Sequence, residues 1–257
     1  MFPEPRTRAG DSPRRIPRIL FQTWETREIS PELQAIVDTW KEKNPEYEYI
    51  FHNNADCEAF IKANFEKNVY DAYCKIIPGA YKADLWRYCV LYKYGGVYAD
   101  IDTICLGSID SFLKDNTECM APVDLNTSPY EGNHNVFNGF MAASPKSSIM
   151  LGCIKRIVFH VEFNLIPNSK LDFSGPGVLG REINLSLNLP ETESVLGKQG
   201  YRDTIHFLTF EFGTEYIKDT TGNVLLQNKN GNEDIQEVYS AECDARQNIS
   251  WLTNRPF

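Results

Sequence analysis

The apolar positions near the start of the chain predict two buried strands. Residues 19–21 are apolar and predict a strand that ends at residues 22–24, and residues 47–51 predict a second strand. The residues before Ile16 show no periodic apolar pattern, so ordered structure is expected to begin there.

Between these two strands the pattern becomes helical. Ser30 and Pro31 are residues preferred at the N-cap and at the first position of a helix. Apolar residues follow at helical spacing as far as Trp40, and the helix is expected to stop before Asn44 and Pro45. A strand, a helix and a strand in this order predict a right-handed βαβ unit and a parallel sheet.

The middle of the chain, residues 55–94, is expected to be mainly helical, in two or three pieces. Gly95 and Gly96 should end the last helix, because glycine tolerates the left-handed backbone that follows many helices. Residues 97–101 then predict a strand.

The second half of the chain shows weaker patterns and no clear second domain. Strands are expected at 120–123 and 137–143, helices at 147–162 and 178–188, and a loop at 175–177. The whole pattern predicts an α/β fold in which helices flank a central, mostly parallel sheet. Residues 16–257 are expected to form this domain, and residues 1–15 a disordered arm rich in Pro and Arg.

Composition narrows the class of protein. The 257 residues suit one large α/β domain, and 42% hydrophobic with 24% charged residues is ordinary for a globular protein. The net charge of −9 argues against a nucleic-acid partner, which would require a basic surface. The negative charge is compatible with a small phosphorylated ligand, because a bound divalent cation makes the local electrostatic potential positive.

The cysteines and the hydropathy of the chain indicate the cellular compartment in which the protein is expected. The seven cysteines form no CxxC pair, which argues against a zinc site, and their odd number excludes a complete disulfide framework. Reduced thiols, no membrane-length apolar run and no signal-peptide core predict a soluble cytoplasmic protein. The Golgi lumen is the alternative if an anchor has been removed.

The N-terminal arm allows two interpretations. A group of arginines lies in it or just after it: Arg6, Arg8, Arg14, Arg15 and Arg18. A solvated tail is the simpler interpretation, and weak contact with an anionic membrane surface is the other.

Two carboxylates follow the predicted strand at 97–101. Side chains alternate faces along a strand, so Tyr98, Asp100 and Asp102 are expected to share one face. Two neighbouring carboxylates at the end of a strand repel each other unless a cation lies between them. Mg²⁺ and Mn²⁺ suit this arrangement, since they take few protein carboxylates and complete their shell with water and phosphate.

A second charged pair lies on the preceding helix. Asp84 and Arg87 are three residues apart and therefore share a helix face. One interpretation is a surface ion pair. The other is a pair that binds sugar hydroxyls, because a carboxylate accepts hydrogen bonds from hydroxyls and a guanidinium donates to them. An Asp-x-Asp pair alone is also a weak signal, and its place after Gly95-Gly96 on a predicted strand strengthens it.

These motifs together resemble a known family. The matching pieces are residues 16–19, 22–24, 40–49, 83–88 and 95–102. Their order and spacing are similar to the DXD-containing sugar-binding region of fungal Golgi α-mannosyltransferases, inositol-phosphoceramide mannosyltransferases, animal α-galactosyltransferases and bacterial capsule enzymes. More distantly they resemble the glucosylating domain of large clostridial toxins. The resemblance implies a GT-A fold and a retaining transfer that requires Mn²⁺ or Mg²⁺.

The resemblance also implies roles for residues of the first half. Trp24 would stack on the donor base, and Gln22 and Thr23 would line the same nucleotide site. Asp84 and Arg87 would bind donor-sugar hydroxyls.

It assigns the Asp-x-Asp segment to the nucleotide and metal. Tyr98 would line the nucleotide pocket, Asp100 would contact ribose, sugar or metal, and Asp102 would ligate the metal directly. Asn138 occupies the place of a sugar-contacting amide, and Gly175-Pro176 matches a Gly-Pro pair that precedes a helix in the family.

The C-terminus departs from the family pattern. Relatives often carry a His several residues before a Ser-Trp pair, which completes the metal and diphosphate site. Ser250 and Trp251 are present here, but no His precedes them. Asp244 or Asn248 would then supply the missing ligand, and a core role for Trp251 is the alternative.

The sequence thus predicts a metal-dependent glycosyltransferase. It would move a hexose from a nucleotide sugar to an acceptor hydroxyl on a glycan, lipid or protein, with a UDP-sugar favoured as the donor over GDP-mannose. One alternative is a sugar-binding module without catalysis. The other is a nucleotidyltransferase, which would require a Gly-rich basic loop after the first strand, where the chain has Gln22-Thr23-Trp24.

Overall fold

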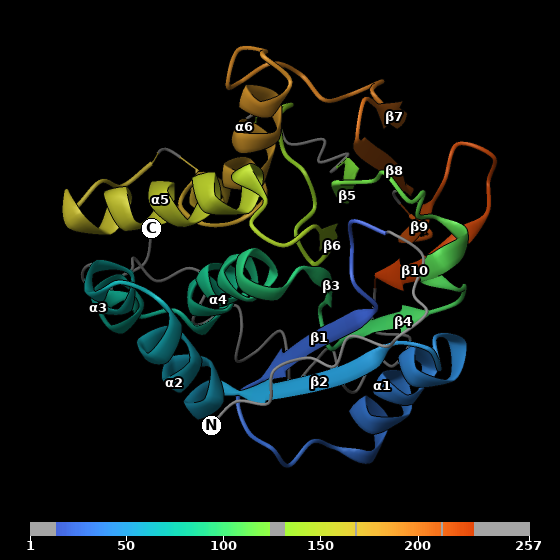
Figure 1. Cartoon of the computed structure of the whole chain (residues 1–257), viewed down its shortest axis with the longest axis horizontal. Helices are drawn as coiled ribbons and strands as arrows, with labels where there is room; N and C mark the ends of the chain where they lie inside the picture. Colours follow the sequence, from blue (N-terminus) through green and yellow to red (C-terminus); the bar gives the residue numbers. More distant parts are fainter. Residues whose placement is uncertain (1–13, 124–131, 168, 212, 229–257) are drawn as a thin grey trace.

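The computed structural model describes residues 14–123, 132–167, 169–211 and 213–228 (Figure 1). The helices in these ranges are α1 (Pro31–Lys43), α2 (Asn54–Asn64), α3 (Lys67–Lys75), α4 (Gly79–Tyr94), α5 (Ser148–Glu162) and α6 (Pro176–Ser186), with short 3₁₀ turns η1 (Ile109–Ser111) and η2 (Lys170–Asp172). The strands are β1 (Ile19–Trp24), β2 (Glu48–Asn53), β3 (Gly96–Ala99), β4 (Thr103–Cys105), β5 (Cys119–Val123), β6 (Phe140–Ala143), β7 (Gly200–Arg202), β8 (Ile205–Glu211), β9 (Tyr216–Lys218) and β10 (Val224–Asn228).

The described strands form one mixed sheet in the order β2-β1-β3-β6-β5-β8-β9-β10-β4, with β7 paired to β8. β1 pairs in parallel with β2 and β3, and β5 pairs in parallel with β8. The remaining ladders are antiparallel. The expected α/β fold with a central sheet flanked by helices is confirmed, and its parallel ladders lie around β1 and between β5 and β8.

Helices cover both faces of the sheet (Figure 1). One core lies between the sheet and helices α2 to α6, and it includes Phe21, Trp86 and Ile157. A second core lies on the other face, where Trp40 of α1 packs with Leu20. The alternation of Leu20 and Phe21 along β1 therefore supplies one apolar side chain to each core.

Local signals placed the first half correctly. The Ser30 hydroxyl accepts a hydrogen bond from the Leu33 N–H at 3.2 Å, so it caps α1 as expected. The helix ends at Asn44, whose N–H donates to the Trp40 carbonyl oxygen. Residues 55–94 form parts of three helices, in agreement with the expected two or three pieces.

The Gly95-Gly96 pair has a structural reason. Gly95 ends α4 with φ +67°, and Gly96 has φ +105°, both in the region that favours glycine. A Cβ on Gly96 would lie 2.7 Å from the Ile19 carbonyl oxygen, so a larger residue would separate β3 from β1. The pair thus allows α4 to turn directly into the centre of the sheet.

Several expected boundaries differ from the structure, three of them near the candidate residues. The strand expected at 97–101 ends at Ala99, the strand expected at 137–143 begins at Phe140, and α6 begins at Pro176 within the expected loop. β3 is short because the Thr103 N–H and hydroxyl both donate to the Asp100 carbonyl oxygen, at 3.1 and 2.6 Å, which closes a turn. Pro176 is compatible with the first turn of a helix, where its missing N–H costs nothing.

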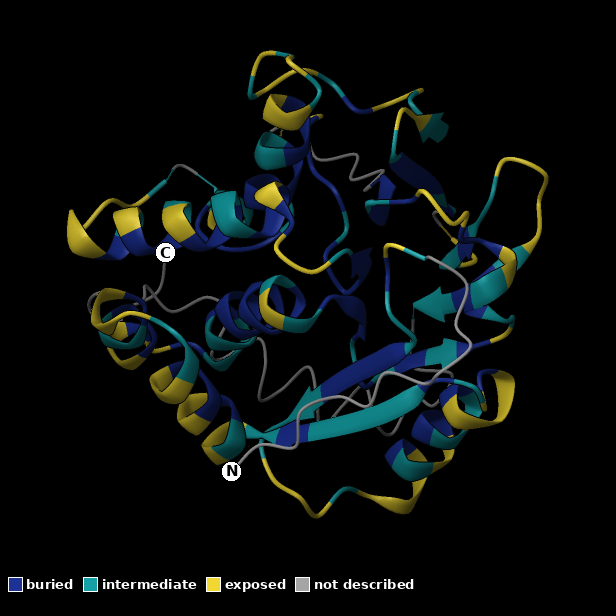
Figure 2. Cartoon of the chain, in the orientation of Figure 1, coloured by how far each residue is buried: buried dark blue, intermediate teal, exposed yellow. Residues whose placement is uncertain are grey.

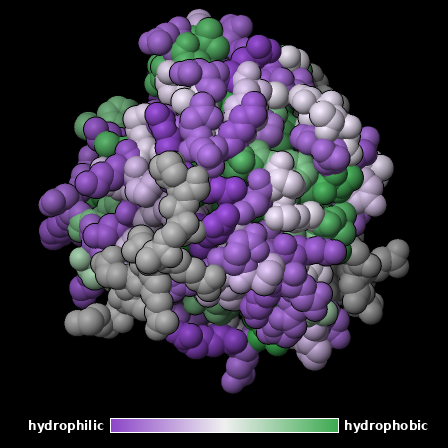
Figure 3. Space-filling view, turned by 45° about the vertical axis from the view of Figure 1, so that its right-hand side comes forward, coloured by the Kyte–Doolittle hydropathy of each residue, from purple (hydrophilic) through white to green (hydrophobic). Residues whose placement is uncertain are grey.

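The surface and the thiols agree with the composition. Hydrophilic side chains dominate the face shown in Figure 3, with smaller apolar areas between them. The cysteines at 57, 74, 89, 105, 119 and 153 are all free thiols. Within the described ranges, no helix combines the length and the apolar character required to span a bilayer.

Candidate functional site

A buried carboxylate on α4 is the centre of the site. Asp84 is 7% exposed. Its Oδ1 accepts a hydrogen bond from Asn138 Nδ2 at 2.8 Å, and its Oδ2 accepts one from the Ser174 hydroxyl at 2.6 Å. The Tyr88 hydroxyl, one turn further along α4, also accepts from Asn138 Nδ2, at 3.2 Å. One helix therefore fixes the segments before β6 and before α6.

Arg87 links this carboxylate to the Asp-x-Asp segment. Its Nη2 lies 3.5 Å from Asp84 Oδ1 and 3.2 Å from Asp100 Oδ1. Its Nη1 donates to the Asn138 carbonyl oxygen at 2.7 Å, and its guanidinium carbon lies 4.4 Å from the centre of the Tyr98 ring. Both Asp84 and Arg87 are buried, so the surface ion pair considered from the sequence is wrong.

Asp100 and Asp102 lie beyond the end of β3, in the turn that Thr103 closes. The Tyr98 hydroxyl donates to Asp100 Oδ1 at 2.6 Å, so these two side chains meet as the alternation predicted. Desolvation raises the pKa of Asp100. Desolvation together with the charge of Asp100 raises the pKa of Asp102 to about 7.

The backbone approaches Asp100 closely at Gly139. The Asp100 N–H donates to the Gly139 carbonyl oxygen at 2.7 Å. A Cβ on Gly139 would lie 2.5 Å from Asp100 Oδ2 and 2.4 Å from Phe137 Cζ. Only glycine fits at this point without displacing the carboxylate or the ring.

The residues at the end of β1 divide between the two faces of the sheet. Gln22 is fully buried, and its Nε2 donates to the Asp100 carbonyl oxygen at 3.2 Å, so it supports the Asp100 turn. Trp24 packs on a small cluster that contains Ile101. Thr23 lies on the other face, where its hydroxyl donates to the His52 carbonyl oxygen at 2.8 Å. The structure therefore brings Gln22 and Trp24, but not Thr23, to the Asp100 turn.

The donor set fits a hard divalent cation. Asp100 and Asp102 offer carboxylate oxygens, and the pKa of Asp102 is raised by desolvation and by its neighbour's negative charge, the second of which a cation would offset. No group of three or more His, Cys, Asp or Glu side chains within the described ranges is placed to hold a metal. Two carboxylates suit Mn²⁺ or Mg²⁺, which complete their shell with water and phosphate. Asp244, Asn248, Ser250 and Trp251 lie outside the described residues.

Sequence reasoning missed three members of this group. Ser174, Tyr88 and Gly139 contact Asp84, Asn138 or Asp100, and none carries a signal by itself. Ser174 and Gly139 are each next to a residue that the motif comparison had selected, Gly175 and Asn138, and this adjacency was the available clue.

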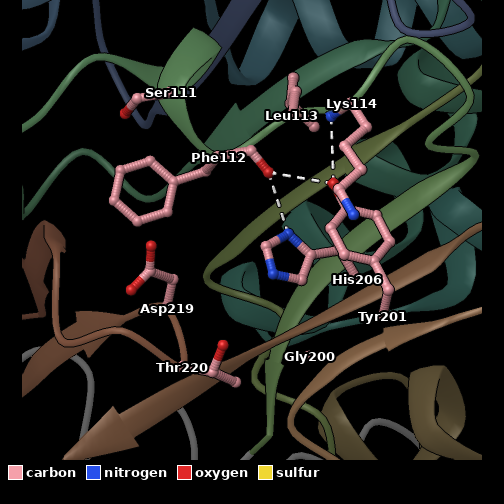
Figure 4. A pocket seen from close by; sticks show the side chains of 9 residues that line it. All are labelled: Ser111, Phe112, Leu113, Lys114, Gly200, Tyr201, His206, Asp219 and Thr220. Carbon is pink, nitrogen blue, oxygen red and sulfur yellow. Dashed lines mark hydrogen bonds between the residues drawn. The ribbon is translucent and has the colours of Figure 1, made fainter.

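A cavity of about 270 Å³ lies elsewhere (Figure 4). It is lined by Ser111, Phe112, Leu113, Lys114, Gly200, Tyr201, His206, Asp219 and Thr220. The Tyr201 and His206 rings stack with centroids 4.2 Å apart. Ala99 pairs with Phe140 at one end of β6, whereas the cavity lies where Cys119 pairs with Ala143 and Ile205, at the other end. The cavity is therefore separate from the Asp100 turn.

Comparisons with known proteins agree with the motifs. Residues 30–118 match the family model described as a glycosyltransferase sugar-binding region containing a DXD motif. Inositol phosphoceramide mannosyltransferase 3 of Schizosaccharomyces pombe is 29% identical over 150 residues, which cover 58% of this chain and 40% of that protein. The initiation-specific alpha-1,6-mannosyltransferase of Candida albicans is 29% identical over 112 residues, which cover 41% of this chain and 29% of that protein. The chain thus spans less than half the length of these curated relatives.

A solved structure shares the fold. The PaToxG glycosyltransferase aligns with a TM-score of 0.54 at 16% identity, over 67% of this chain and 70% of that one. At this level of identity the likeness concerns the fold alone. The resemblance to DXD-containing glycosyltransferases and the GT-A type of fold that it implied are both confirmed.

Proposed function

We propose, from the premise that residues 30–118 form the DXD-containing sugar-binding region of a glycosyltransferase, that this chain transfers a hexose from a nucleotide sugar to an acceptor hydroxyl. The observation that carries the proposal is the hydrogen-bonded group around Asp84, Arg87 and Asp100, at α4 and the ends of β3 and β6, in which Asp84 and Arg87 are buried. Such a group holds its side chains in fixed positions before a ligand arrives.

Each part of this group has a proposed task. Asp84 accepts hydrogen bonds from hydroxyls of the transferred sugar. These hydroxyls either replace Asn138 and Ser174 as hydrogen-bond partners of Asp84 or bind in addition to them. Arg87 donates to the same sugar. Trp24 stacks on the base, next to the cluster that contains Ile101.

Asp100 and Asp102 are the proposed metal ligands. A bound Mn²⁺ or Mg²⁺ supplies Lewis-acid stabilisation to the departing diphosphate. Tyr98 and Arg87 orient Asp100, since both contact its Oδ1. Gln22 and Gly139 fix the Asp100 backbone, so the carboxylate occupies one position without reorganisation.

The similar proteins change which nucleotide sugar we propose as the sugar donor. The sequence pattern favoured a UDP-sugar, with GDP-mannose as the less favoured donor. Both named relatives are mannosyltransferases, which favours GDP-mannose. We also propose retention by front-face substitution, in which the acceptor hydroxyl attacks on the side from which the diphosphate leaves; it rests on the family resemblance.

A turnover assay tests the proposal. The chain is incubated with GDP-mannose, UDP-glucose or UDP-galactose, with Mn²⁺ or with EDTA, and release of the nucleoside diphosphate is measured. Mn²⁺-dependent release from one donor is expected, and NMR of the product sugar reports the anomer. Saturable binding of a donor without release in any condition would favour the alternative of a sugar-binding module.

A further inference from the structure

One end of α5 presents a concentration of apolar side chains. Within the described ranges, eight large apolar residues are at least 40% exposed, and four of them lie between 159 and 166. These are Phe159 at 49%, Phe163 at 61%, Leu165 at 40% and Ile166 at 51%. The Phe159 and Phe163 rings are in contact, with centroids 4.7 Å apart. We call these four residues the α5-end patch.

The end of α5 is linked to the start of α4 through the segment that contains Phe173. The His160 Nδ1 lies 2.9 Å from the Phe173 carbonyl oxygen, and the Phe173 ring lies 5.0 Å from that of Tyr81, in the first turn of α4. The end of α5 and the start of α4 are therefore at the same end of the helix layer. Ile77, two residues before α4, is 46% exposed there. Figure 2 shows this end of the layer as an exposed margin around buried helix faces.

Two exposed lysines flank the patch along the chain. Lys155 lies four residues before Phe159 and Lys170 lies four residues after Ile166, while Glu162, within the segment, is an exposed acid. Arg156 is directed away, toward Glu182 and Glu191. In a chain with a net charge of −9, the segment 155–170 thus carries more basic than acidic side chains.

We propose that the α5-end patch docks on the surface of an anionic phospholipid bilayer. Aromatic and aliphatic side chains insert at the boundary between headgroups and acyl chains, and lysines around them gain from anionic headgroups. Lys155 and Phe159 are one helical turn apart, so the lysine stem lies beside the ring while its charge stays in the headgroup layer.

The size of the patch favours a bilayer over a second copy of the chain. The exposed parts of the four side chains amount to about 400 Å², roughly half of what one partner contributes to a standard protein interface. A bilayer does not demand that area, since a few inserted side chains and adjacent lysines are sufficient for reversible binding.

Vesicle flotation tests this proposal independently of catalysis. The full chain is floated with phosphatidylcholine vesicles that contain or lack phosphatidylserine. The expected result is at least about tenfold stronger partitioning into the anionic vesicles. The doubly substituted F159D/F163D chain is expected to lose this partitioning, and the K155E/K170E chain to lose the preference for phosphatidylserine.

A matched control uses exposed apolar residues elsewhere. Leu185 and Leu196 are 43% and 41% exposed, so L185D/L196D adds the same charge outside the patch and should float like the unmodified chain. All variants should keep a cooperative thermal melt. The proposal is overturned if the unmodified chain does not float, or if F159D/F163D floats as well as the control, which would assign binding to another surface such as the N-terminal arm. A dimer in sedimentation equilibrium that F159D/F163D abolishes would overturn it in favour of a second copy.

Discussion

Ser174 and Asp84 are 90 residues apart in the sequence, and the Ser174 hydroxyl donates a 2.6 Å hydrogen bond to Asp84 Oδ2. Both side chains are buried, and the other oxygen of Asp84 accepts from Asn138. This bond ties the segment before α6 to α4. It also limits how Asp84 presents its oxygens to a ligand.

Ser174→Ala should weaken donor binding selectively. The substitution removes one of the two side-chain donors to Asp84, so unfolding free energy should fall by about 1–3 kcal/mol. We expect a higher KM for the nucleotide sugar with unchanged affinity for the free nucleoside diphosphate. Steady-state kinetics and calorimetry measure the two effects. Ser186→Ala is the control, since the exposed Ser186 hydroxyl donates to Ile183 within α6; an equal change in both variants would contradict the role of Ser174.

Asp102→Asn should keep the fold and lower Mn²⁺-dependent turnover by about a hundredfold or more, the scale expected for a preorganised electrostatic contact. The carboxylate lies in the Asp100 turn, where desolvation and the charge of Asp100 raise its pKa to about 7. Asp38→Asn, at a half-exposed carboxylate of α1 that pairs with Lys41, is the control. Unchanged turnover in Asp102→Asn would remove Asp102 from the metal site.

Gly139→Ala should displace Asp100. The new Cβ would lie 2.5 Å from Asp100 Oδ2, so we expect weaker Mn²⁺ binding and a loss of about 1–3 kcal/mol of unfolding free energy from overpacking. Gly79→Ala is a matched control, because nothing lies within 4 Å of its Cβ position. Isothermal titration with Mn²⁺ compares the two, and equal affinities would show that the turn adapts without cost to the carboxylate.

Arg87→Lys should reduce affinity for the nucleotide sugar more than affinity for the free nucleotide. Lysine cannot reproduce the contacts that the guanidinium makes with Asn138, Asp100 and the Tyr98 ring. Arg87→Ala is less informative, because it leaves a buried carboxylate without its cation. That lowers the unfolding free energy by about 3–5 kcal/mol and would confuse a loss of stability with a loss of binding. Calorimetry with both ligands is the measurement. Equal losses for the two ligands would indicate that Arg87 only supports the fold.

Asp172 should make stability depend on pH in the acid range. Burial alone would raise its pKa, but hydrogen bonds from His134 and Arg181 lower the pKa to about 2. Because the folded pKa lies below the unfolded value, the stabilisation is present above about pH 4 and is lost as pH falls toward 2. Unfolding free energies of Asp172→Asn and the unmodified chain should therefore differ by about 2 kcal/mol at neutral pH and converge in acid. A difference that does not change with pH would contradict this.

The sequence by itself determined the parts of the protein that depend on near neighbours. Ser30 and Pro31 located α1, and Gly95-Gly96 located the end of α4, because caps and left-handed glycines act on backbone groups within a few residues. The pairing of Asp84 with Arg87, and of Tyr98 with Asp100, follows from helix and strand periods in the same way.

Only the tertiary structure decided which distant segments meet these pairs. Asn138 and Ser174 reach Asp84 across 54 and 90 residues, and this depends on the order of strands and on the packing of α6 against α5. The Asp100 N–H likewise finds its acceptor, the Gly139 carbonyl oxygen, in a distant segment. Local periodicity indicates which face of an element is polar, whereas the partner of each polar group is fixed when the sheet assembles and every buried donor must find an acceptor.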